Sequence, residues 1–358
     1  MSRPYQILRP RESPSLLSIV IPLYDEHELV PILRQQMEEF LLELPCDAEV
    51  VLVNDGSTDE TLELLMDWAA ADPRVKVLGL ARNFGHQIAA TAGLDHALGD
   101  AVVLMDADLQ DPLEVIHQML GLYRRGYDVV YGQRNRRVGE TWFKKVTAWA
   151  FYRIMRTFVH PDLPPDTGDF RLMSRRCLDA LRTMPEQHRF LRGMVAWVGF
   201  AQTAVRYDRR PRAAGSTKYT LHKMLRFAWT AIVSFSSLPL RASFYLGSLM
   251  AMLGLAWGAI AVVRHVAGDT VPGWTSQMVM TCLIGATILI SNGILGSYVG
   301  QIFEEIKRRP LYIISSVANA PAGLAETPSP LGPEGQAGAA RLGLPKPSVE
   351  TMNLRKAG

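Results

Sequence analysis

Short apolar runs, separated by longer amphipathic stretches, constrain the fold of this chain more than any other feature of its sequence. Each run is a nearly unbroken apolar block, as is typical of a strand that is covered on both faces of its sheet. Alternation of such strands with stretches of helix length is typical of a parallel sheet with crossover helices. We therefore expect an α/β fold, with strands at Leu17–Pro22, Val50–Asn54, Val75–Leu80, Ala101–Asp106 and Asp128–Gln133.

Acidic side chains follow three of these runs, at the points where the strands end. Because ligands of parallel sheets bind beyond the carboxyl ends of the strands, these side chains are expected to meet at one edge. Carboxylates that share a cleft must be hydrogen-bonded, paired or neutralised, and hard divalent cations prefer oxygen ligands. The pattern predicts a Mg²⁺ or Mn²⁺ site. The residues concerned are Asp25, Glu26, Asp55, Asp106, Asp108 and, as a neutral oxygen ligand, Gln110.

Two helix starts are indicated between the predicted strands. Ser57 followed by Glu60 has the spacing of a capping box. Asp111 precedes a proline, which is favoured at the first position of a helix. Helices are therefore expected to begin directly after Ser57 and directly after Asp111.

Several other classes of protein are disfavoured. No GxGxxG follows the first apolar run and no GxxxxGK[ST] occurs in the chain, which argues against a dehydrogenase and a P-loop NTPase. A net charge of +3 without a finger or RNA-binding signature argues against nucleic acid as a partner. Cys46, Cys177 and Cys282 match neither a zinc site nor a redox pair and are expected to be reduced. A phosphatase with an aspartyl nucleophile stays a distant alternative.

Two uncharged apolar runs, Ser243–Val263 and Met278–Val299, are each about as long as the ~20 residues that a membrane-spanning helix needs. Their connector carries Arg264, His265 and Asp269, whereas the outer flanks are basic. By the positive-inside rule, both flanks, the α/β part and both termini are expected in the cytoplasm. No signal peptide is expected before Leu16, and two buried core helices are the alternative. The basic flanking residues are Lys223, Arg226, Arg241, Lys307, Arg308 and Arg309.

These patterns divide the chain into seven expected segments. They are an N-terminal extension (1–15), a cytosolic catalytic domain (16–220), an interfacial amphipathic helix (221–238), two transmembrane helices (240–264 and 276–300), a juxtamembrane basic segment (301–318) and a disordered tail (319–358). A buried helix is the alternative for the amphipathic segment. The protein is thus expected to be anchored in a membrane by a helical hairpin.

Five motifs make the sequence recognisable. Leu17–Pro22, Asn54–Asp59 and Asp106–Pro112, in that order and spacing, resemble the inverting family-2 glycosyltransferases of GT-A fold. Thr167–Met173 and Arg212–Tyr219, followed by two membrane-length runs, are similar to the polyprenyl-phosphate branch of that family. Within this branch the chain most resembles the bactoprenol glucosyltransferases, and dolichyl-phosphate mannose synthases are relatives. The resemblance covers about Leu16 to Ile314.

The resemblance implies roles for individual residues. Positions that bind the nucleotide-sugar are matched by Pro22, Tyr24, Glu26, Asp55, Asp106 and Arg134. Metal ligands are matched by Asp106, Asp108 and Gln110, and catalytic positions by Asp169 and Arg171. Positions that bind the acceptor phosphate are matched by Arg171, Arg212, Ser216 and Lys218. The planar fork of arginine suits phosphate oxygens. The chain departs from the family pattern at Asp25, Ala214 and Thr217, which affects fine contacts and not the class.

The implied reaction is transfer of a hexose, glucose first, from a UDP-sugar to a polyprenyl phosphate. A metal and arginines would stabilise the leaving diphosphate. The acceptor phosphate has a second pKa near 6, so Asp169 is expected to act either as a base or as an organiser of Arg171. GDP-mannose, UDP-aminoarabinose and UDP-GlcNAc stay open as donors, and so does a homo-oligomer.

Two other functions are weighed against this reaction. A processive polysaccharide synthase is remote, because only two membrane-length runs are present and Gln187–Leu191 does not fit the QxxRW motif. A catalytically inactive scaffold could keep the same fold without the chemistry. The intact set of Asp55, Asp106, Asp108, Asp169 and Arg171 argues against it.

Overall fold

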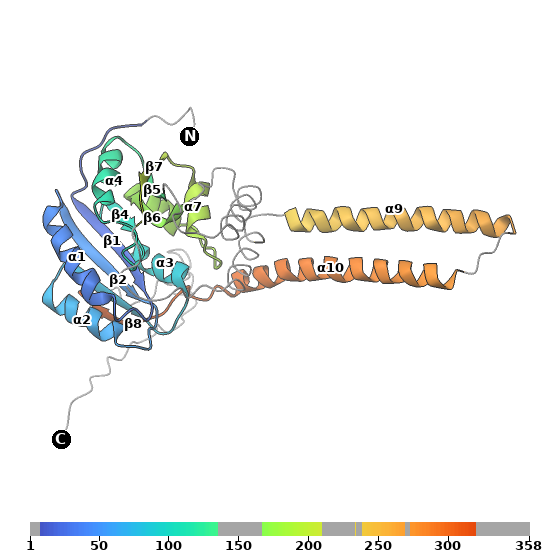
Figure 1. Ribbon diagram of the computed structural model, residues 1–358, viewed down its shortest axis with the longest axis horizontal. Coiled ribbons are helices and arrows are strands. Elements are labelled where there is room, and N and C mark those ends of the chain that lie inside the picture. Colours follow the sequence, from blue (N-terminus) through green and yellow to red (C-terminus); the bar gives the residue numbers. More distant parts are fainter. Residues whose placement is uncertain (1–7, 135–166, 210–232, 234–237, 269–272, 320–358) are drawn as a thin grey trace, which may run out of the picture.

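A mixed sheet of eight strands forms the body of the protein (Figure 1). The computed structural model describes residues 8–134, 167–209, 233, 238–268 and 273–319. Within them the strand order is β7-β5-β6-β4-β1-β2-β3-β8. The strands are β1 (Leu16–Leu23), β2 (Asp47–Asn54), β3 (Val75–Leu80), β4 (Ala101–Leu104), β5 (Val129–Arg134), β6 (Thr167–Ser174), β7 (Gln202–Tyr207) and β8 (Ile314–Ala318).

The sheet has a parallel half and a mixed half. In the first half β4, β1, β2 and β3 run parallel to one another. In the second half β6 runs antiparallel to both β4 and β5, and β7 is parallel to β5. The register of β6 on β4 places Arg171 opposite Leu104. All five strands expected from the sequence are confirmed, whereas β6, β7 and β8 were not predicted.

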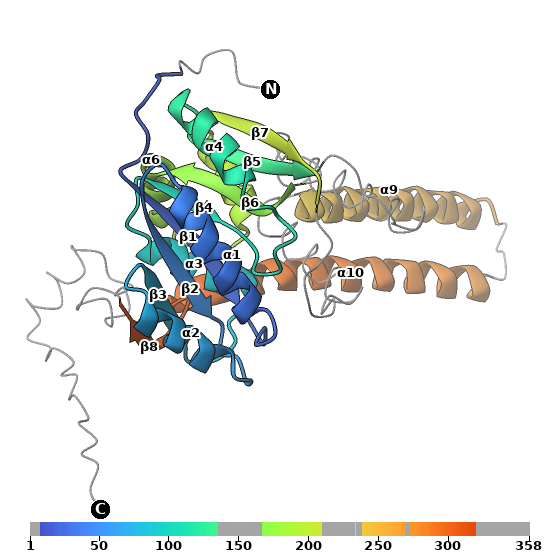
Figure 2. The same ribbon diagram turned by 60° about the vertical axis from the view of Figure 1, so that its left-hand side comes forward.

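Helices cover both faces of the sheet, and each face has its own apolar core (Figure 2). One face packs against α1 (Val30–Glu43), α2 (Thr61–Ala71) and α4 (Val115–Arg124). The other packs against α3 (His86–His96), α6 (Arg175–Arg182) and α7 (Leu191–Val198). Both faces of β1 and β2 are buried, which is why their sequences are apolar without alternation.

Helix α3 lies closer to the sheet than a side chain would allow at one position. A Cβ atom on Gly93 would approach Val20 Cγ1 to 2.3 Å. Glycine at this position therefore allows α3 to pack closely against β1 and β2. The helix begins directly after Gly85, whose φ of 99° favours glycine, and so brings His86 to the edge where the strands of the parallel half end.

Both helix starts expected from capping signals are wrong. Helix α2 begins at Thr61, and Ser57 instead accepts a hydrogen bond from the backbone N–H of Asp25 (2.9 Å). Helix α4 begins at Val115, and Asp111 is instead 1% exposed and accepts a hydrogen bond from the Tyr207 hydroxyl. Polar groups at these strand ends thus hold neighbouring loops together, a tertiary use that competes with capping.

Two long helices, α9 (Leu238–Val266) and α10 (Trp274–Lys307), extend side by side from the sheet domain (Figure 1). Both are long and apolar enough to cross a membrane. Their large apolar side chains are exposed, as at Leu255 (76%) and Leu289 (72%). An apolar surface of this extent on a helix pair marks a surface for lipid or another apolar partner.

After α10 the chain returns to the sheet. Strand β8 pairs antiparallel with the edge strand β3. The Tyr312 hydroxyl donates to Asp95 (3.1 Å), and the Asn319 amide donates to the Val75 carbonyl (3.0 Å). The C-terminal end of α10 is therefore attached to the sheet domain through this strand and these hydrogen bonds.

Candidate active site

Asp55 ties three loops together at the carboxyl ends of β1 and β2. Its carboxylate is buried and accepts hydrogen bonds from the backbone N–H groups of Phe84 (2.7 Å) and Gly85 (2.9 Å). Its own N–H donates to the Leu23 carbonyl (2.8 Å). Burial raises the pKa of Asp55, although the hydrogen bonds from Phe84 and Gly85 favour the ionised form and act in the opposite direction. Asp55 thus fixes the floor of the site and the loop that leads into α3.

The other residues expected on the nucleotide side surround Asp55. Pro22 is buried within β1, opposite Val53 of β2. Tyr24 and Glu26 are half-buried in the loop that follows β1. The backbone N–H of Glu26 donates to the Thr61 hydroxyl (2.9 Å). These residues therefore lie at the predicted edge.

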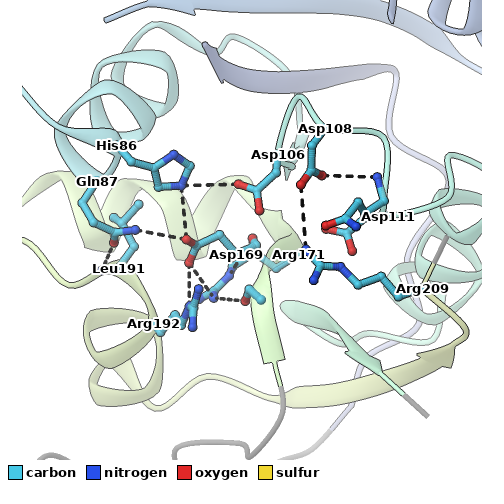
Figure 3. A network of polar contacts seen from close by, with 12 residues as sticks. His86, Gln87, Asp106, Asp108, Asp111, Asp169, Arg171, Leu191, Arg192 and Arg209 are labelled. Atoms are coloured by element: carbon cyan, nitrogen blue, oxygen red, sulfur yellow. Dashed lines mark hydrogen bonds and ion pairs between the residues drawn. The ribbon is translucent and has the colours of Figure 1, made fainter. Parts of the chain in front are cut away.

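The centre of the site is a triad of His86, Asp106 and Asp169, whose side chains point toward one another (Figure 3). The His86 Nε2 atom lies 3.4 Å from an Asp106 oxygen and 3.3 Å from an Asp169 oxygen. The potential ligand atoms of all three residues lie within 4.8 Å of one another. Asp106 follows β4 of the parallel half and Asp169 lies in β6 of the mixed half, so the triad joins the two halves.

Both oxygens of the Asp169 carboxylate accept hydrogen bonds from neighbouring side chains. One oxygen accepts from Arg192 Nε (2.8 Å), and the other accepts from Gln87 Nε2 (3.1 Å). The buried Arg171 donates to the backbone carbonyls of Gly168 (3.0 Å) and Asp169 (3.2 Å). Arg171 therefore braces the strand that carries Asp169, while Arg192 and Gln87 hold the carboxylate itself.

The charges of the triad favour one pattern of protonation. Burial disfavours the charged form of His86, but the hydrogen bond to Asp169 and the charge of Asp106 outweigh it and raise its pKa to about 9. Burial likewise opposes ionisation of Asp169, yet the charge of Arg192 and the hydrogen bond from His86 hold its pKa well below the usual value. Burial lowers the pKa of Arg171 to about 10. The structure thus favours an imidazolium at His86 next to an ionised carboxylate at Asp169.

Asp108 lies beside Asp106 on the same loop (Figure 3). It is 7% exposed and accepts a hydrogen bond from the backbone N–H of Gln110 (3.2 Å). Arg209 approaches its other oxygen to 3.8 Å. Burial raises the pKa of Asp106, and the nearby charges of Asp169 and Asp108 act in the same direction. The charge of His86 opposes this rise in the pKa of Asp106, which therefore lies between a cation and two other acidic side chains.

Arg134 is anchored by a buried carboxylate. Its guanidinium lies 3.8 Å from Asp111, which also accepts a hydrogen bond from Tyr207. A Cβ atom on Gly168 would come within 2.9 Å of the Arg134 side chain. Gly168, which directly precedes Asp169 near the start of β6, has no side chain and so leaves room for the Arg134 guanidinium.

The residues of the site fit a divalent cation. Asp106 and Asp108 supply carboxylate oxygens from one loop, which hard cations prefer. His86 can serve as a ligand only in its neutral form, and the raised pKa of His86 disfavours that form. Asp106 and Asp108 supply the oxygen donors that suit Mg²⁺ or Mn²⁺, and Asp106 also belongs to the triad whose potential ligand atoms lie close together.

The expected site residues fall into two groups. The structure gathers Asp55, Asp106, Asp108, Asp169 and Arg171 at one edge of the sheet. Arg212, Ser216 and Lys218 lie outside the described residues. The sequence missed His86, Gln87, Arg192 and Arg209. His86 and Gln87 follow the third predicted strand, so inspection of that strand end would have found them, whereas nothing in the sequence pointed to Arg192.

Comparisons with known proteins decide the family. The model of glycosyl transferase family 2 matches residues 18–182. An uncharacterized glycosyltransferase of Synechocystis is 45% identical over 302 residues, 84% of this chain and 95% of that protein. The bactoprenol glucosyl transferase of Shigella phage SfX is 38% identical over 301 residues, 84% of this chain and 99% of that protein. The chain belongs to glycosyltransferase family 2.

The resemblance seen in the motifs is thereby confirmed, together with the GT-A-like α/β fold. The enzyme is a glycosyltransferase. Among solved structures, a mannosyltransferase of Pyrobaculum calidifontis in complex with GDP-Man and Mn²⁺ is 16% identical and covers 80% of this chain and 89% of its own, with a TM-score of 0.40.

Proposed function

We propose that this glycosyltransferase moves a hexose, glucose first, from a UDP-sugar to a polyprenyl phosphate, with inversion at the anomeric carbon. Residues 16–220 would form the catalytic domain and α9 and α10 would span the membrane, with the catalytic domain and both termini in the cytoplasm. The basic flanks of the two helices support this orientation. The name of the Shigella phage relative supports the acceptor and the sugar.

One observation carries the proposal: the carboxylate site lies in a domain that is attached directly to two helices of membrane length. The exposed apolar side chains of α9 and α10 need an apolar surrounding, and β8 returns the chain from α10 to the sheet of the site. A water-soluble acceptor would not require such an arrangement. A lipid acceptor, whose phosphate lies at the membrane surface, does.

Asp106 and Asp108, with Gln110, would hold Mg²⁺ or Mn²⁺ against the diphosphate of the donor. Such an ion neutralises the charge that develops on the leaving nucleoside diphosphate. Arg134, which Asp111 holds in place, is available for the same oxygens. Pro22, Tyr24, Glu26 and Asp55 would bind the nucleoside.

Asp169 would orient the acceptor side of the reaction. Its carboxylate is bound by Arg192, Gln87 and His86, and a group held so firmly is suited to fixing cations toward a phosphate. The acceptor phosphate is largely dianionic at neutral pH and can attack without losing a proton. Arg212, Ser216 and Lys218 would complete the acceptor site.

The test uses the full-length enzyme in vesicles that contain undecaprenyl phosphate. Radiolabelled UDP-glucose, UDP-GlcNAc, UDP-aminoarabinose and GDP-mannose are supplied one at a time, and label that partitions into organic solvent is measured. We expect the largest signal with UDP-glucose, its loss in EDTA and its recovery on addition of Mg²⁺ or Mn²⁺.

Each result bears on a different part of the proposal. A product with another donor would replace glucose as the sugar and leave the acceptor in place. A product that persists in EDTA would contradict the metal. Absence of lipid product with every donor, in a preparation that still binds UDP, would overturn the acceptor.

A further inference from the structure

The C-terminal end of α10, here called its base, is hydrogen-bonded to the polar segment that contains Gln187. The Glu305 carboxylate, in the last turns of α10, accepts a hydrogen bond from the backbone N–H of Gln187 (2.8 Å). The Gln187 side chain donates to the Arg309 carbonyl (3.0 Å), just beyond the helix. Two hydrogen bonds thus fix Gln187 to the end of α10.

The same segment reaches the active site a few residues later. The backbone N–H of Leu191 donates to Gln87 Oε1 (3.0 Å), and the same Gln87 amide donates to Asp169 (3.1 Å). Arg192 then donates to the other oxygen of Asp169 (2.8 Å). Residues 191 and 192 therefore hold both oxygens of this carboxylate, one directly and one through Gln87.

Only three residues separate Gln187 from Leu191, and the connection passes from half-buried at residues 187–189 to buried at its end. Phe190 is 5% exposed and Leu191 is 2% exposed. Arg189, between the two ends, donates to the Met184 carbonyl (2.5 Å). A segment this short, hydrogen-bonded at Gln187 and at Leu191 and buried at the latter end, leaves little room to absorb a displacement between them.

We propose that Glu305 is a positioning residue of the active site, which through Gln187 sets Arg192 and Gln87 against Asp169. The enzyme would then use the base of its second apolar helix as part of the framework that orients a carboxylate on β6. The inference rests on the role proposed above for Asp169. It links the direction of α10 in the membrane to the geometry of the site, so that a correctly inserted helix is a condition for turnover.

The test compares Glu305→Ala with Glu305→Gln in the full-length enzyme. The amide oxygen of glutamine can accept the same hydrogen bond, whereas alanine cannot. We expect Glu305→Ala to lower kcat about tenfold with the donor KM within about twofold of wild type, because small misplacements of catalytic groups are costly. Glu305→Gln should recover most of the activity. Glu304→Ala, which removes a neighbouring carboxylate paired with Lys307, is the matched control and should leave kcat unchanged.

A double-variant cycle separates positioning from a loss of stability. Combined with Arg192→Lys, Glu305→Ala should cost less than the product of the two single effects, because both act on Asp169. Full multiplicativity, or equal loss in Glu305→Ala and Glu305→Gln, would overturn the proposal. If Glu305→Ala does not fold, Glu305→Asp, whose shorter side chain draws the carboxylate back from the Gln187 N–H, should lower kcat about threefold, and an unchanged kcat would overturn the proposal.

Hydrogen exchange provides a readout that needs no turnover. The Leu191 amide should exchange faster in Glu305→Ala than in Glu304→Ala, because its hydrogen bond to Gln87 is loosened. An unchanged exchange rate would overturn the coupling even if the wild-type enzyme formed no lipid product. Failure of the coupling and failure of the proposed function are thereby distinguished.

Discussion

The two halves of the sheet bring residues to the same edge by opposite routes. In the parallel half, β1, β2 and β4 deliver the residues that follow their last positions, as with Asp55 and Asp106. In the mixed half, β6 runs antiparallel to β4 and delivers Asp169 from among its first positions. The antiparallel strand β6 therefore adds Asp169 to the carboxylates that follow the parallel strands, and His86 lies between Asp106 and Asp169.

This comparison assigns different tasks to the two halves. The parallel half holds the carboxylates that we propose bind a cation and a nucleotide, whereas the mixed half holds Asp169, which we propose orients the acceptor phosphate. Substitutions in the first half should impair binding of metal and donor. Substitutions in the second half should impair turnover after the donor has bound.

The largest effect is expected for Asp108→Asn in the parallel half. If Asp108 holds the metal as proposed, its loss removes stabilisation of the leaving diphosphate, and kcat/KM should fall about 10³-fold. Binding of UDP, measured by calorimetry, should also lose its dependence on Mn²⁺. Asp67→Asn, on the exposed side of α2, is the matched control. Metal-dependent UDP binding in Asp108→Asn would contradict the division between the halves.

A smaller loss is expected for Asp169→Asn in the mixed half. Asparagine keeps the size of the side chain but not the charge that holds Arg192 and His86. At pH 7.5 kcat should fall about 10²-fold, while UDP binding in the presence of Mn²⁺ stays near that of wild type. Nearly full turnover at pH 7.5 would show that the charge of Asp169 is dispensable, and weakened UDP binding would show that the halves are not separate.

A still smaller effect is expected for His86→Gln, at the junction of the halves. Removing the cation between Asp106 and Asp169 leaves two carboxylates in mutual repulsion, and kcat should fall about tenfold. If His86 acts as a charge and not as a ligand, the concentration of Mn²⁺ needed for half-maximal activity should stay the same or decrease. A large increase in that concentration would instead identify His86 as a metal ligand.

The contrast between the halves also explains what could be predicted from the sequence. Strands β1 to β5 were found because each contains an apolar run, and in β1 to β4 most of that run is buried on both faces. Strand β6 carries Asp169 and Arg171 among its apolar residues, and β7 is partly exposed, so their patterns are weak. Strand β8 joins the sheet only through pairing with β3, 236 residues away in the Ser315 to Gly79 contact, and no local signal marks such a partner.

The residues of the candidate site were predicted in part, and more fully in the parallel half than in the mixed half. Asp55, Asp106 and Asp108 follow apolar runs, so position alone indicated them, and Asp169 and Arg171 were indicated by resemblance. Arg192 could not be found, because its relation to Asp169 depends on how the segment before α7 packs. Asp111 was found but given a capping role, since its burial beneath Tyr207 is a property of the assembled sheet.

The smallest expected effect concerns stability and lies in the parallel half, away from the site. Glu49, at the beginning of β2, is 5% exposed and accepts hydrogen bonds from Ser18 (2.6 Å) and the Leu98 N–H (2.6 Å), beside Lys76. Burial opposes its ionisation, but these partners outweigh it and lower its pKa. Its contribution to stability is therefore present above the unfolded pKa and lost as pH falls through the folded pKa.

Glu49→Gln should reduce the free energy of unfolding by about 1–3 kcal/mol at pH 7, with kcat and KM unchanged. Thermal unfolding from pH 7 to pH 4 should show wild type and variant converging at acid pH, and a gap that does not change with pH would show that the charge of Glu49 contributes nothing.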